Sequence, residues 1–395
     1  MLLSTILRWL ALLSFVLNLW QWFVARRFPL HQRLATPGMD EVEAGSVPAT
    51  KLHPPKPPGV TLLKPLKGAD AETDACLRSW FKQDYDGDIQ ILFGVASADD
   101  PVCPIVRRLL AEFPRTNAEL VICGPLGGTN LKVAKLAQLE PKAAHQLLVV
   151  SDADVRVPSD FLTNALPLLD SPKVGLVNCF YELANPGTAA LQWEAVAINA
   201  DFWSQVLQSK SLKPLDFALG AVMATRRQQL NEIGGFAALA DCLADDYQLG
   251  NRIARRGYRI ELCPVVVECW TEPMSWGQVW RHQLRWARTI RVCQPLPYFF
   301  SILSNATLWP LLWLAAHPGL RELTFAGCFW LARLGTALNL QQLLTGTPAR
   351  LSTAWLIPLK DLLQAGIWFL AFLGNRVEWR GRSMRLRRDG TLAEA

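Results

Sequence analysis

Three groups of acidic residues carry the strongest chemical signal in this sequence. Asp152 and Asp154 directly follow the apolar run 147–151, and Asp100 follows the apolar run 89–95. Residues two apart in an extended chain point to the same side, so the carboxylates of Asp152 and Asp154 converge on one point. Hard cations such as Mg²⁺ and Mn²⁺ prefer oxygen ligands, commonly one or two carboxylates together with phosphate oxygens. The pair suggests a metal–phosphate site, although an isolated Asp-x-Asp more often ends a strand as a solvated turn.

The third acidic group, Asp245 and Asp246, begins a helix-like stretch that ends near Arg256 and Gly257. A carboxylate within hydrogen-bond reach of a hydroxyl can remove its proton during attack on an electrophile. Acidic residues in a first helical turn also complement the helix dipole, and this structural explanation is about as good as the catalytic one.

A basic, tryptophan-rich segment lies at 280–288, and it includes Arg281, His282, Arg285 and Trp286. Its plain interpretation is a helix on the membrane surface with aromatic anchors. Its sharper interpretation has Arg285 neutralising a phosphate group and Trp286 packing against an acceptor molecule. One amphipathic helix can serve both purposes.

The elements that must position these side chains are strands and helices in alternation. Short apolar runs typical of buried strands occur at 60–66, 89–95, 119–123, 147–151 and 174–180. Helix-like segments separate the first four, at 71–83, 101–113 and 129–139. This alternation predicts an α/β domain over 59–275 with a mostly parallel, Rossmann-like sheet covered on both faces. Ligands of such sheets bind beyond the carboxyl ends of the strands, which is where Asp100, Asp152 and Asp154 lie.

The chain is apolar at its beginning. Residues 2–24 reach the length of about 20 residues that crosses a bilayer. A signal peptide is the alternative, but Arg26 and Arg27 follow instead of a small-residue cleavage site. The sequence therefore predicts a retained anchor at 1–24, with the following domain in the cytoplasm. Residues 25–58 form a linker that ends in a proline-rich run and packs no core.

Apolar stretches return near the other end, at about 295–316, 323–345 and 353–373. The first is the clearest candidate for a membrane span. Arg333 in the second is costly in a membrane unless it is paired, and Lys360 and Asp361 make the third resemble an interfacial helix.

The predicted topology at this end contains a conflict. We expect an interfacial helix at 276–294, transmembrane or interfacial helices over 295–375 and a basic tail at 376–395. Three C-terminal spans after one N-terminal span would place this tail outside the cell, yet its arginines favour the inside. One of the three stretches is therefore expected to lie on the membrane instead of crossing it.

Composition narrows the protein class. Of 395 residues, 51% are hydrophobic and 19% charged, which fits an integral membrane protein better than a disordered or purely cytosolic one. A net charge of +6 gives no reason to expect a nucleic acid partner, and no protein partner is indicated. The nine cysteines form no C-x-x-C pair, which predicts reduced, buried thiols.

Seven motifs in one order resemble a known family. They are VTLLKPLKG, ADDP, NLKV, SDADVRVP, GGF, ADDYQLG and RHQLRWAR. Together they are similar to the ceramide glucosyltransferase type of glycosyltransferase family 21, which is related to family 2, and to its hopanoid-associated bacterial branch. The resemblance runs from the N-terminal anchor to the tail and implies a GT-A fold on the cytosolic membrane face. It also implies a nucleotide-sugar donor, usually a divalent metal, and inversion at the anomeric carbon.

The resemblance assigns roles in binding the donor. Asp100 would contact uridine, and Lys132 would lie near the nucleotide or its diphosphate. Asp152 and Asp154 would hold the ribose, the diphosphate and a Mn²⁺ or Mg²⁺ ion, with Asp154 as the principal metal ligand. Arg281 and His282 lie where further contacts to the donor are expected.

The resemblance also implies the catalytic residues. Asp246 would be the general base and Asp245 its acidic neighbour, while Arg285 and Trp286 would belong to the Q/R-x-x-R-W motif. His282 stands where the wider family has Gln or Arg, which leaves the role of this position open.

The implied reaction moves a sugar from a UDP-sugar to a hydroxyl of a membrane lipid, most simply glucose to ceramide. Transfer of N-acetylglucosamine from UDP-N-acetylglucosamine to a hopanoid polyol is the alternative, and diacylglycerol is another possible acceptor. A phosphatase of the haloacid-dehalogenase type is disfavoured because Arg156 follows the Asp pair where Thr or Val is required. A non-catalytic membrane protein and a processive polysaccharide synthase are further alternatives, and the second normally has more spans.

Overall fold

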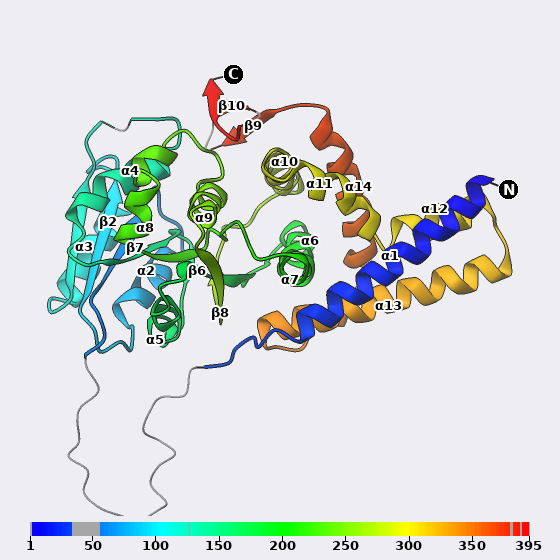
Figure 1. The fold of residues 1–395 in the computed structure, drawn as a ribbon, viewed down its shortest axis with the longest axis horizontal. Helices are drawn as coiled ribbons and strands as arrows, with labels where there is room; N and C mark the ends of the chain where they lie inside the picture. The colour runs from blue at the N-terminus through cyan, green and yellow to red at the C-terminus, as the bar shows by residue number, and fades with distance from the viewer. Residues whose placement is uncertain (1, 34–55, 126, 380–381, 388, 395) are drawn as a thin grey trace, which may run out of the picture.

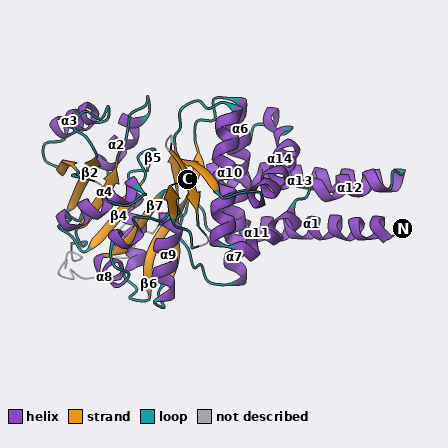
Figure 2. Cartoon of the chain, turned by 90° about the horizontal axis from the view of Figure 1, so that it is seen from above, coloured by secondary structure: helices purple, strands orange, loops and turns teal. Residues whose placement is uncertain are grey.

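The computed structural model describes residues 2–33, 56–125, 127–379, 382–387 and 389–394. They form a helix-covered sheet domain and a group of long apolar helices that projects from one side of it (Figures 1 and 2). Most of the expected linker, residues 34–55, lies outside the described residues, as do Arg380 and Arg388 of the expected basic tail.

The central sheet has eight strands in the order β3-β2-β1-β4-β7-β6-β8-β5. Its parallel half consists of β1 (Val60–Pro65), β2 (Ile89–Val95), β3 (Asn117–Ile122) and β4 (Leu147–Ser151). The other half consists of β5 (Val155–Arg156), β6 (Val174–Leu183), β7 (Val222–Arg226) and β8 (Arg259–Cys269). The strand β7 runs antiparallel to β4 and β6, whereas β6 and β8 are parallel. The expected strands are therefore present, with one antiparallel strand in the middle of the sheet.

Helices cover both faces of the parallel half because its strands are apolar on both sides. Leu62 of β1 packs with α2 (Thr73–Phe81) and α3 (Cys103–Glu112), and its neighbour Leu63 packs on the opposite face with α4 (Leu131–Leu139). Shorter helices, α5 (Phe161–Ala165) and α8 (Arg227–Glu232), lie beside β8 and β7. With the parallel strands fixed in this way, the residues that follow them share one edge of the sheet.

The helices α6 (Ala189–Val196), α7 (Trp203–Leu212), α9 (Asp245–Arg255) and α10 (Trp276–Cys293) cover the second half of the domain. A π-helical segment, Ala197–Phe202, joins α6 to α7. Their buried side chains belong to the same hydrophobic core as those of the apolar helices. The sheet domain and the apolar helices are thus packed together and are not merely tethered.

The apolar helices are α1 (Leu2–Arg26), α11 (Pro295–Ser301), α12 (Leu308–Ala316), α13 (Leu320–Thr345) and α14 (Leu356–Phe372). Among the described residues, the helices Leu2–Arg26 and Leu351–Phe372 are long and apolar enough to cross a membrane. A third span exists only if the bent pair formed by α11 with its 3-10 extension and by α12 counts as one. The helix α13 has 26 residues but is not among the candidates.

The stretch 295–316, expected to be the clearest C-terminal span, is not one straight helix, so it crosses a membrane only as a bent pair. Its two helical parts are bent by 55° at a short break. Pro310 lies in the first turn of α12, where it cannot donate the hydrogen bond that would continue the earlier helix. The side chain of Asn305 accepts hydrogen bonds from Thr307 N and Leu308 N and so starts α12 anew.

A buried charge network joins the apolar helices to the sheet domain. Arg333 of α13 donates to both carboxylates around it, at 2.8–3.0 Å from Asp201 and 2.8–2.9 Å from Asp361. Lys360 of α14 donates to Asp201, and Thr307 Oγ1 donates to Asp361 at 2.6 Å. The charged residues in the two last apolar stretches are thus paired with one another and with Asp201 of the π-helical segment. The two positive and two negative charges balance, so the free-energy cost of an unpaired Arg333 in an apolar environment does not arise.

Replacing Arg333 with Met is expected to lower the free energy of unfolding by about 3 kcal/mol, since it leaves Asp201 and Asp361 sharing only Lys360 in a buried site. Denaturation of the detergent-solubilised protein, followed by circular dichroism, measures the change. Arg350→Met, at an exposed position after the same helix, is the matched control. Equal unfolding midpoints for the two variants would contradict the assigned role of the network.

The expected basic tail contains a small antiparallel sheet of β9 (Arg376–Trp379), β10 (Arg382–Leu386) and β11 (Leu392–Glu394). The buried apolar side chains of this small sheet pack against Leu243. The backbone of Cys242 also forms an isolated antiparallel β-bridge with Thr391. Arg288 and Arg291 of α10 donate to Arg376 O and Asn375 Oδ1 just before this sheet. The C-terminal strands therefore hold the loop before α9 and the helix α10 in place.

Candidate active site

Lys132 lies at the centre of the acidic residues that follow the strands. Its ammonium nitrogen is 2.7 Å from Asp152 Oδ1 and 3.0 Å from Asp245 Oδ2. The side chains of Lys132 and Asp245 are only 11% and 12% exposed, whereas Asp152 is 38% exposed. The fold thus brings together residues from α4, from the end of β4 and from the start of α9, which are far apart in the chain.

Close backbone contact places Asp245 and Asp246 at this edge. A Cβ atom at Gly250 of α9 would lie 2.3 Å from the backbone nitrogen of Ala218, so only glycine lets this helix approach the chain before β7. A Cβ atom at Gly220 would lie 2.8 Å from Asp246 Oδ2. These glycines allow the carboxylate of Asp246 to lie directly against the backbone that leads into β7.

The protonation of Asp246 is set by its surroundings. Burial, followed by the charge of Asp245, raises the pKa of the Asp246 carboxyl to about 6, against the opposing charge of Lys132. Asp246 Oδ1 accepts a hydrogen bond from Tyr247 N at 2.7 Å. A carboxylate with this pKa is ionised at neutral pH and is a better proton acceptor than an ordinary aspartate.

A second lysine, Lys64 of β1, is completely buried beneath the Asp pair. Its nitrogen donates to Asp152 O at 2.6 Å and to Ser151 Oγ at 3.2 Å. Burial lowers the pKa of Lys64 to about 8, and the carboxylates of Asp154 and Asp152 oppose this shift. Lys64 therefore fixes the backbone turn from which both carboxylates project.

The donor atoms of Asp152 and Asp154 fit a divalent cation that is shared with a diphosphate. Both residues follow β4 and keep part of their surface accessible, Asp154 more than Asp152. Within the described part of the chain, no group of three or more His, Cys, Asp or Glu side chains is arranged to hold a metal. A Mg²⁺ or Mn²⁺ ion would accordingly take one or two carboxylates from the protein and its other oxygen ligands from phosphate and water.

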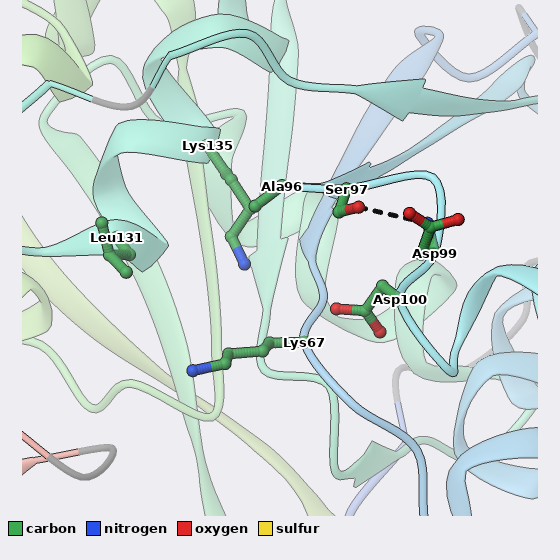
Figure 3. Close-up of a pocket in the computed structure, with 7 residues that line it drawn as sticks. All are labelled: Lys67, Ala96, Ser97, Asp99, Asp100, Leu131 and Lys135. Carbon is green, nitrogen blue, oxygen red and sulfur yellow. Dashed lines mark hydrogen bonds between the residues drawn. The ribbon is translucent and has the colours of Figure 1, made fainter.

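A cavity of about 290 Å³ opens beside this cluster, beyond the ends of β1 and β2 (Figure 3). It is lined by Lys67, Ala96, Ser97, Asp99, Asp100, Leu131 and Lys135. Asp100 Oδ1 accepts hydrogen bonds from Gly68 N and Val102 N at 2.9 and 3.1 Å, which fixes its carboxylate at the wall of the cavity. Leu131 lines the cavity and the next residue along α4, Lys132, belongs to the charge cluster, so the cavity and the cluster are neighbours. The cavity therefore lies where a nucleoside attached to a diphosphate would extend.

Two backbone N–H groups at the start of α4 are already satisfied by a capping side chain. The side chain of Asn130 accepts hydrogen bonds from Lys132 N and Val133 N, at 3.0 and 3.2 Å. Asn130 Nδ2 donates to Cys242 O at 2.8 Å. At this end of α4, the side chain of Lys132 is therefore a candidate contact for a phosphate group.

The helix α10 presents the residues of the Arg-Trp motif in different directions. His282 Nδ1 lies 2.7 Å from Glu194 Oε1, and the rings of His282 and Trp286 are 4.6 Å apart. Arg285 is partly buried between them along the helix. Arg281 is exposed and pairs with Glu378 of β9 at 3.6 Å. The ion pairs and hydrogen bonds found among the described residues join neither Arg281 nor His282 to the acidic cluster.

Aromatic rings bridge the space between the acidic cluster and α10. The rings of Tyr181 and Phe202 are 5.6 Å apart, and those of Phe202 and Trp286 are 6.3 Å apart. Burial raises the pKa of Tyr181 well above its usual range, and the charges of Asp246 and Glu194 both add to this shift. This aromatic row gives the site an apolar wall on the side of the apolar helices.

Lys64, Tyr181 and Glu194 are site residues that the sequence motifs did not single out. Lys64 and Glu194 stand as lone charges within apolar segments, VTLLKPL and ALQWEAV. A buried charge needs a partner, so a lone charge in a core segment was an available signal. Tyr181 left no such signal, since a tyrosine at the end of a strand is common.

Comparison with known proteins agrees with this geometry. A family model described as glycosyl transferase family 21 matches residues 8–392. Ceramide glucosyltransferase 3 of Caenorhabditis elegans is 24% identical over 349 residues, which cover 85% of this chain and 74% of the relative. The ceramide glucosyltransferase of Candida albicans is 34% identical over 119 residues, covering 27% of this chain and 22% of the relative. A beta-monoglucosyldiacylglycerol synthase of Trichormus variabilis is 24% identical over 239 residues, covering 58% of this chain and 48% of the relative.

The fold has a solved counterpart. The mannosyltransferase PcManGT from Pyrobaculum calidifontis, in complex with GDP-Man and Mn²⁺, superimposes with a TM-score of 0.52 at 21% identity. The match covers 91% of this chain and 99% of that protein. The predicted α/β fold of GT-A type, with apolar helices towards both ends of the chain, is confirmed.

Proposed function

Because the chain belongs to glycosyl transferase family 21, we propose that it transfers glucose from UDP-glucose to a hydroxyl of a membrane lipid, with ceramide as the first candidate acceptor. The relatives named as ceramide glucosyltransferases and glucosyldiacylglycerol synthases support a lipid acceptor and glucose as the sugar. The observation that carries the proposal is the meeting of Asp152, Lys132, Asp245 and Asp246 at one edge of the sheet, next to an aromatic wall that faces the apolar helices.

Asp246 acts as the general base in this proposal. A lipid hydroxyl is a poor nucleophile at neutral pH, and a carboxylate within hydrogen-bond reach takes its proton as the oxygen attacks the anomeric carbon. A pKa of about 6 keeps Asp246 ionised and ready to accept that proton. One displacement turns an α-linked donor into a β-linked glycolipid.

The donor is held on the other side of the same cluster. The cavity with Asp100 receives the uridine, and Lys132 reaches the diphosphate from α4. A Mn²⁺ or Mg²⁺ ion held by Asp154 and Asp152 would supply positive charge to the departing UDP. Arg285 of α10 would add a fixed positive charge that stabilises the negative charge developing on the diphosphate. The ring of Trp286 would pack against the acceptor.

We also propose that the sheet domain faces the cytoplasm. The C-terminal end of α1, which carries Arg26, lies on the side of the sheet domain, as do the strands β9–β11 with their arginines (Figure 1). The helix α14 packs on α10 and α6 and also contacts α13, and in Figure 1 it runs in a different direction from α1 and α13. An α14 that lies along the membrane surface would remove the topological conflict if the bent pair α11–α12 and α13 both cross, because the tail would then stay on the same side as the catalytic domain.

An assay of the purified full-length chain tests the proposed function. The protein in detergent is incubated with Mn²⁺ and either UDP-glucose or UDP-N-acetylglucosamine, with short-chain ceramide, short-chain diacylglycerol or a hopanoid polyol as acceptor. Mass spectrometry identifies the products. We expect β-glucosylceramide from UDP-glucose, whereas free glucose as the only product, or no turnover of any donor with any acceptor, would contradict the proposal.

The pH dependence of turnover is expected to report Asp246. Only the ionised carboxylate accepts a proton, so kcat/KM should fall about tenfold per pH unit below a pH of about 6 and level off above pH 7. The charge of Asp245 contributes to the raised pKa, and therefore Asp245→Asn should shift the acid limb to lower pH. A limb that keeps its position in Asp245→Asn would show that another group controls the rate.

A further inference from the structure

Glu194 of α6 is a buried carboxylate with no part in the mechanism above. It is 1% exposed, and its Oε1 atom accepts a hydrogen bond from Gln283 Nε2 at 2.9 Å. The same oxygen lies 2.7 Å from His282 Nδ1. Both partners come from one face of α10, so a single carboxylate of the sheet domain holds this face of the helix.

The contact with Glu194 determines which nitrogen of the His282 ring carries the proton. A carboxylate oxygen that already accepts from Gln283 is an acceptor, so Nδ1 of the imidazole carries the proton and donates it. In the neutral imidazole, the other ring nitrogen, Nε2, then presents a lone pair. A histidine oriented by a carboxylate in this way offers a fixed hydrogen-bond acceptor at Nε2. Of the Gln and Arg that the family resembled by this sequence has at this position, Gln offers both a donor and an acceptor and Arg only donors.

His282 lies on the acceptor side of the site. Its ring is 4.6 Å from that of Trp286, and the rings of Phe202 and Tyr181 continue the same aromatic row. The side chain of His282 is 28% exposed, whereas that of Glu194 is 2% exposed. The imidazole thus has an accessible part next to the apolar wall, while the group that orients it is closed off from solvent.

We propose that His282, oriented by Glu194, accepts a hydrogen bond from a second polar N–H or O–H group of the lipid acceptor. The inference rests on the proposed function, since the first hydroxyl of that lipid is the one that attacks the donor. Ceramide carries a second hydroxyl and an amide N–H, whereas diacylglycerol carries one hydroxyl and otherwise only ester oxygens. An acceptor atom at Nε2 therefore selects ceramide-like lipids over diacylglycerol. Glu194 is a positioning residue for this selection.

The experiment compares short-chain ceramide with short-chain diacylglycerol in wild type, His282→Ala, His282→Gln and Glu194→Gln. In His282→Ala, the ratio of kcat/KM for ceramide to that for diacylglycerol should fall roughly fivefold to tenfold, the value of one hydrogen bond. The fall should appear in the KM for ceramide, with the KM for UDP-glucose unchanged. His282→Gln supplies an amide oxygen and should restore part of the ratio. Glu194→Gln should lower the ratio less than His282→Ala, because the amide weakens the orientation of the ring without removing it.

Glu119→Gln, at an exposed glutamate of β3 far from α10, is the matched control and should leave the ratio unchanged. Loss of turnover with both acceptors to the same extent in His282→Ala and His282→Gln would overturn the inference, because it would indicate a purely structural role. A wild-type preference for diacylglycerol would also overturn it, while leaving lipid glucosylation intact.

Binding of the two lipids separates this inference from the proposed function. Calorimetric titration with each short-chain lipid in the presence of UDP measures the two affinities. Tighter binding of ceramide than of diacylglycerol in wild type, lost in His282→Ala, supports the selection even if no sugar transfer is detected. Equal affinities in wild type and variant would contradict it whether or not the protein transfers glucose.

Discussion

Asp246→Asn is expected to lower kcat for glucose transfer by about 10³-fold while leaving the affinity for UDP-glucose nearly unchanged. An amide cannot take the proton of the attacking hydroxyl. It can, however, keep the shape of the site, because its oxygen can still accept the hydrogen bond that Tyr247 N donates to Asp246 Oδ1. The donor contacts proposed for Lys132, Asp152 and Asp154 lie outside the substituted side chain.

Two measurements on the same preparation test this prediction. Release of UDP with saturating ceramide gives kcat, and calorimetric titration with UDP-glucose gives the donor affinity. Asp170→Asn, the same chemical change at an exposed residue after the short helical segment Leu166–Leu169, should behave as wild type in both. Turnover of Asp246→Asn close to that of wild type would rule out Asp246 as the base. A parallel loss of donor affinity would indicate instead that the residue supports donor binding.

Asp154→Ala is expected to abolish the dependence of UDP binding on Mn²⁺. The carboxylates of Asp152 and Asp154 are the protein oxygens placed to share a cation with a diphosphate. Asp152 has one oxygen paired with Lys132, so Asp154 is the more available ligand. Without this carboxylate, the protein should lose the metal-dependent part of its affinity for UDP, about tenfold or more. Turnover should fall at least as far, because the charge of the leaving UDP is then less stabilised.

Calorimetric titration of UDP with and without Mn²⁺ measures this effect directly. In wild type, Mn²⁺ should tighten binding, and in Asp154→Ala the two titrations should agree. Asp86→Ala, at an exposed residue before β2, should keep the wild-type response. If wild-type affinity for UDP is the same with and without Mn²⁺, the Asp pair is not a metal site and its proposed role must be given up.

The two predictions differ in how far sequence alone supports them. Asp152 and Asp154 follow an apolar strand at a spacing that by itself brings two carboxylates together, and the structure leaves them at the end of β4. Asp246 has no such local signature. Its first-turn position on α9 is equally typical of a dipole complement, and only its raised pKa and its place against Gly220 distinguish it.

The membrane part shows the limits of hydropathy. An apolar stretch of sufficient length predicted a span at 295–316, but the fold breaks it at Asn305 and Pro310. Arg333, Lys360 and Asp361 looked like obstacles to insertion, and they are the partners of a balanced network that includes Asp201 from the sheet domain. A hydropathy value averages over neighbouring residues in the chain, so it takes no account of an ion-pair partner 132 residues away.

Sequence patterns alone were enough to predict the α/β class, five of the eight strands of the central sheet and the acidic residues that follow two of them. Each of these depends on apolar periodicity or on neighbours within a few positions. Only the tertiary structure decided that Lys132 joins Asp152 to Asp245, that Glu194 orients His282 and that Asp201 neutralises Arg333. These contacts depend on how helices from distant parts of the chain pack over one sheet. The energy of a buried charge depends on the partner that packing supplies, so its function becomes visible only when that partner is known.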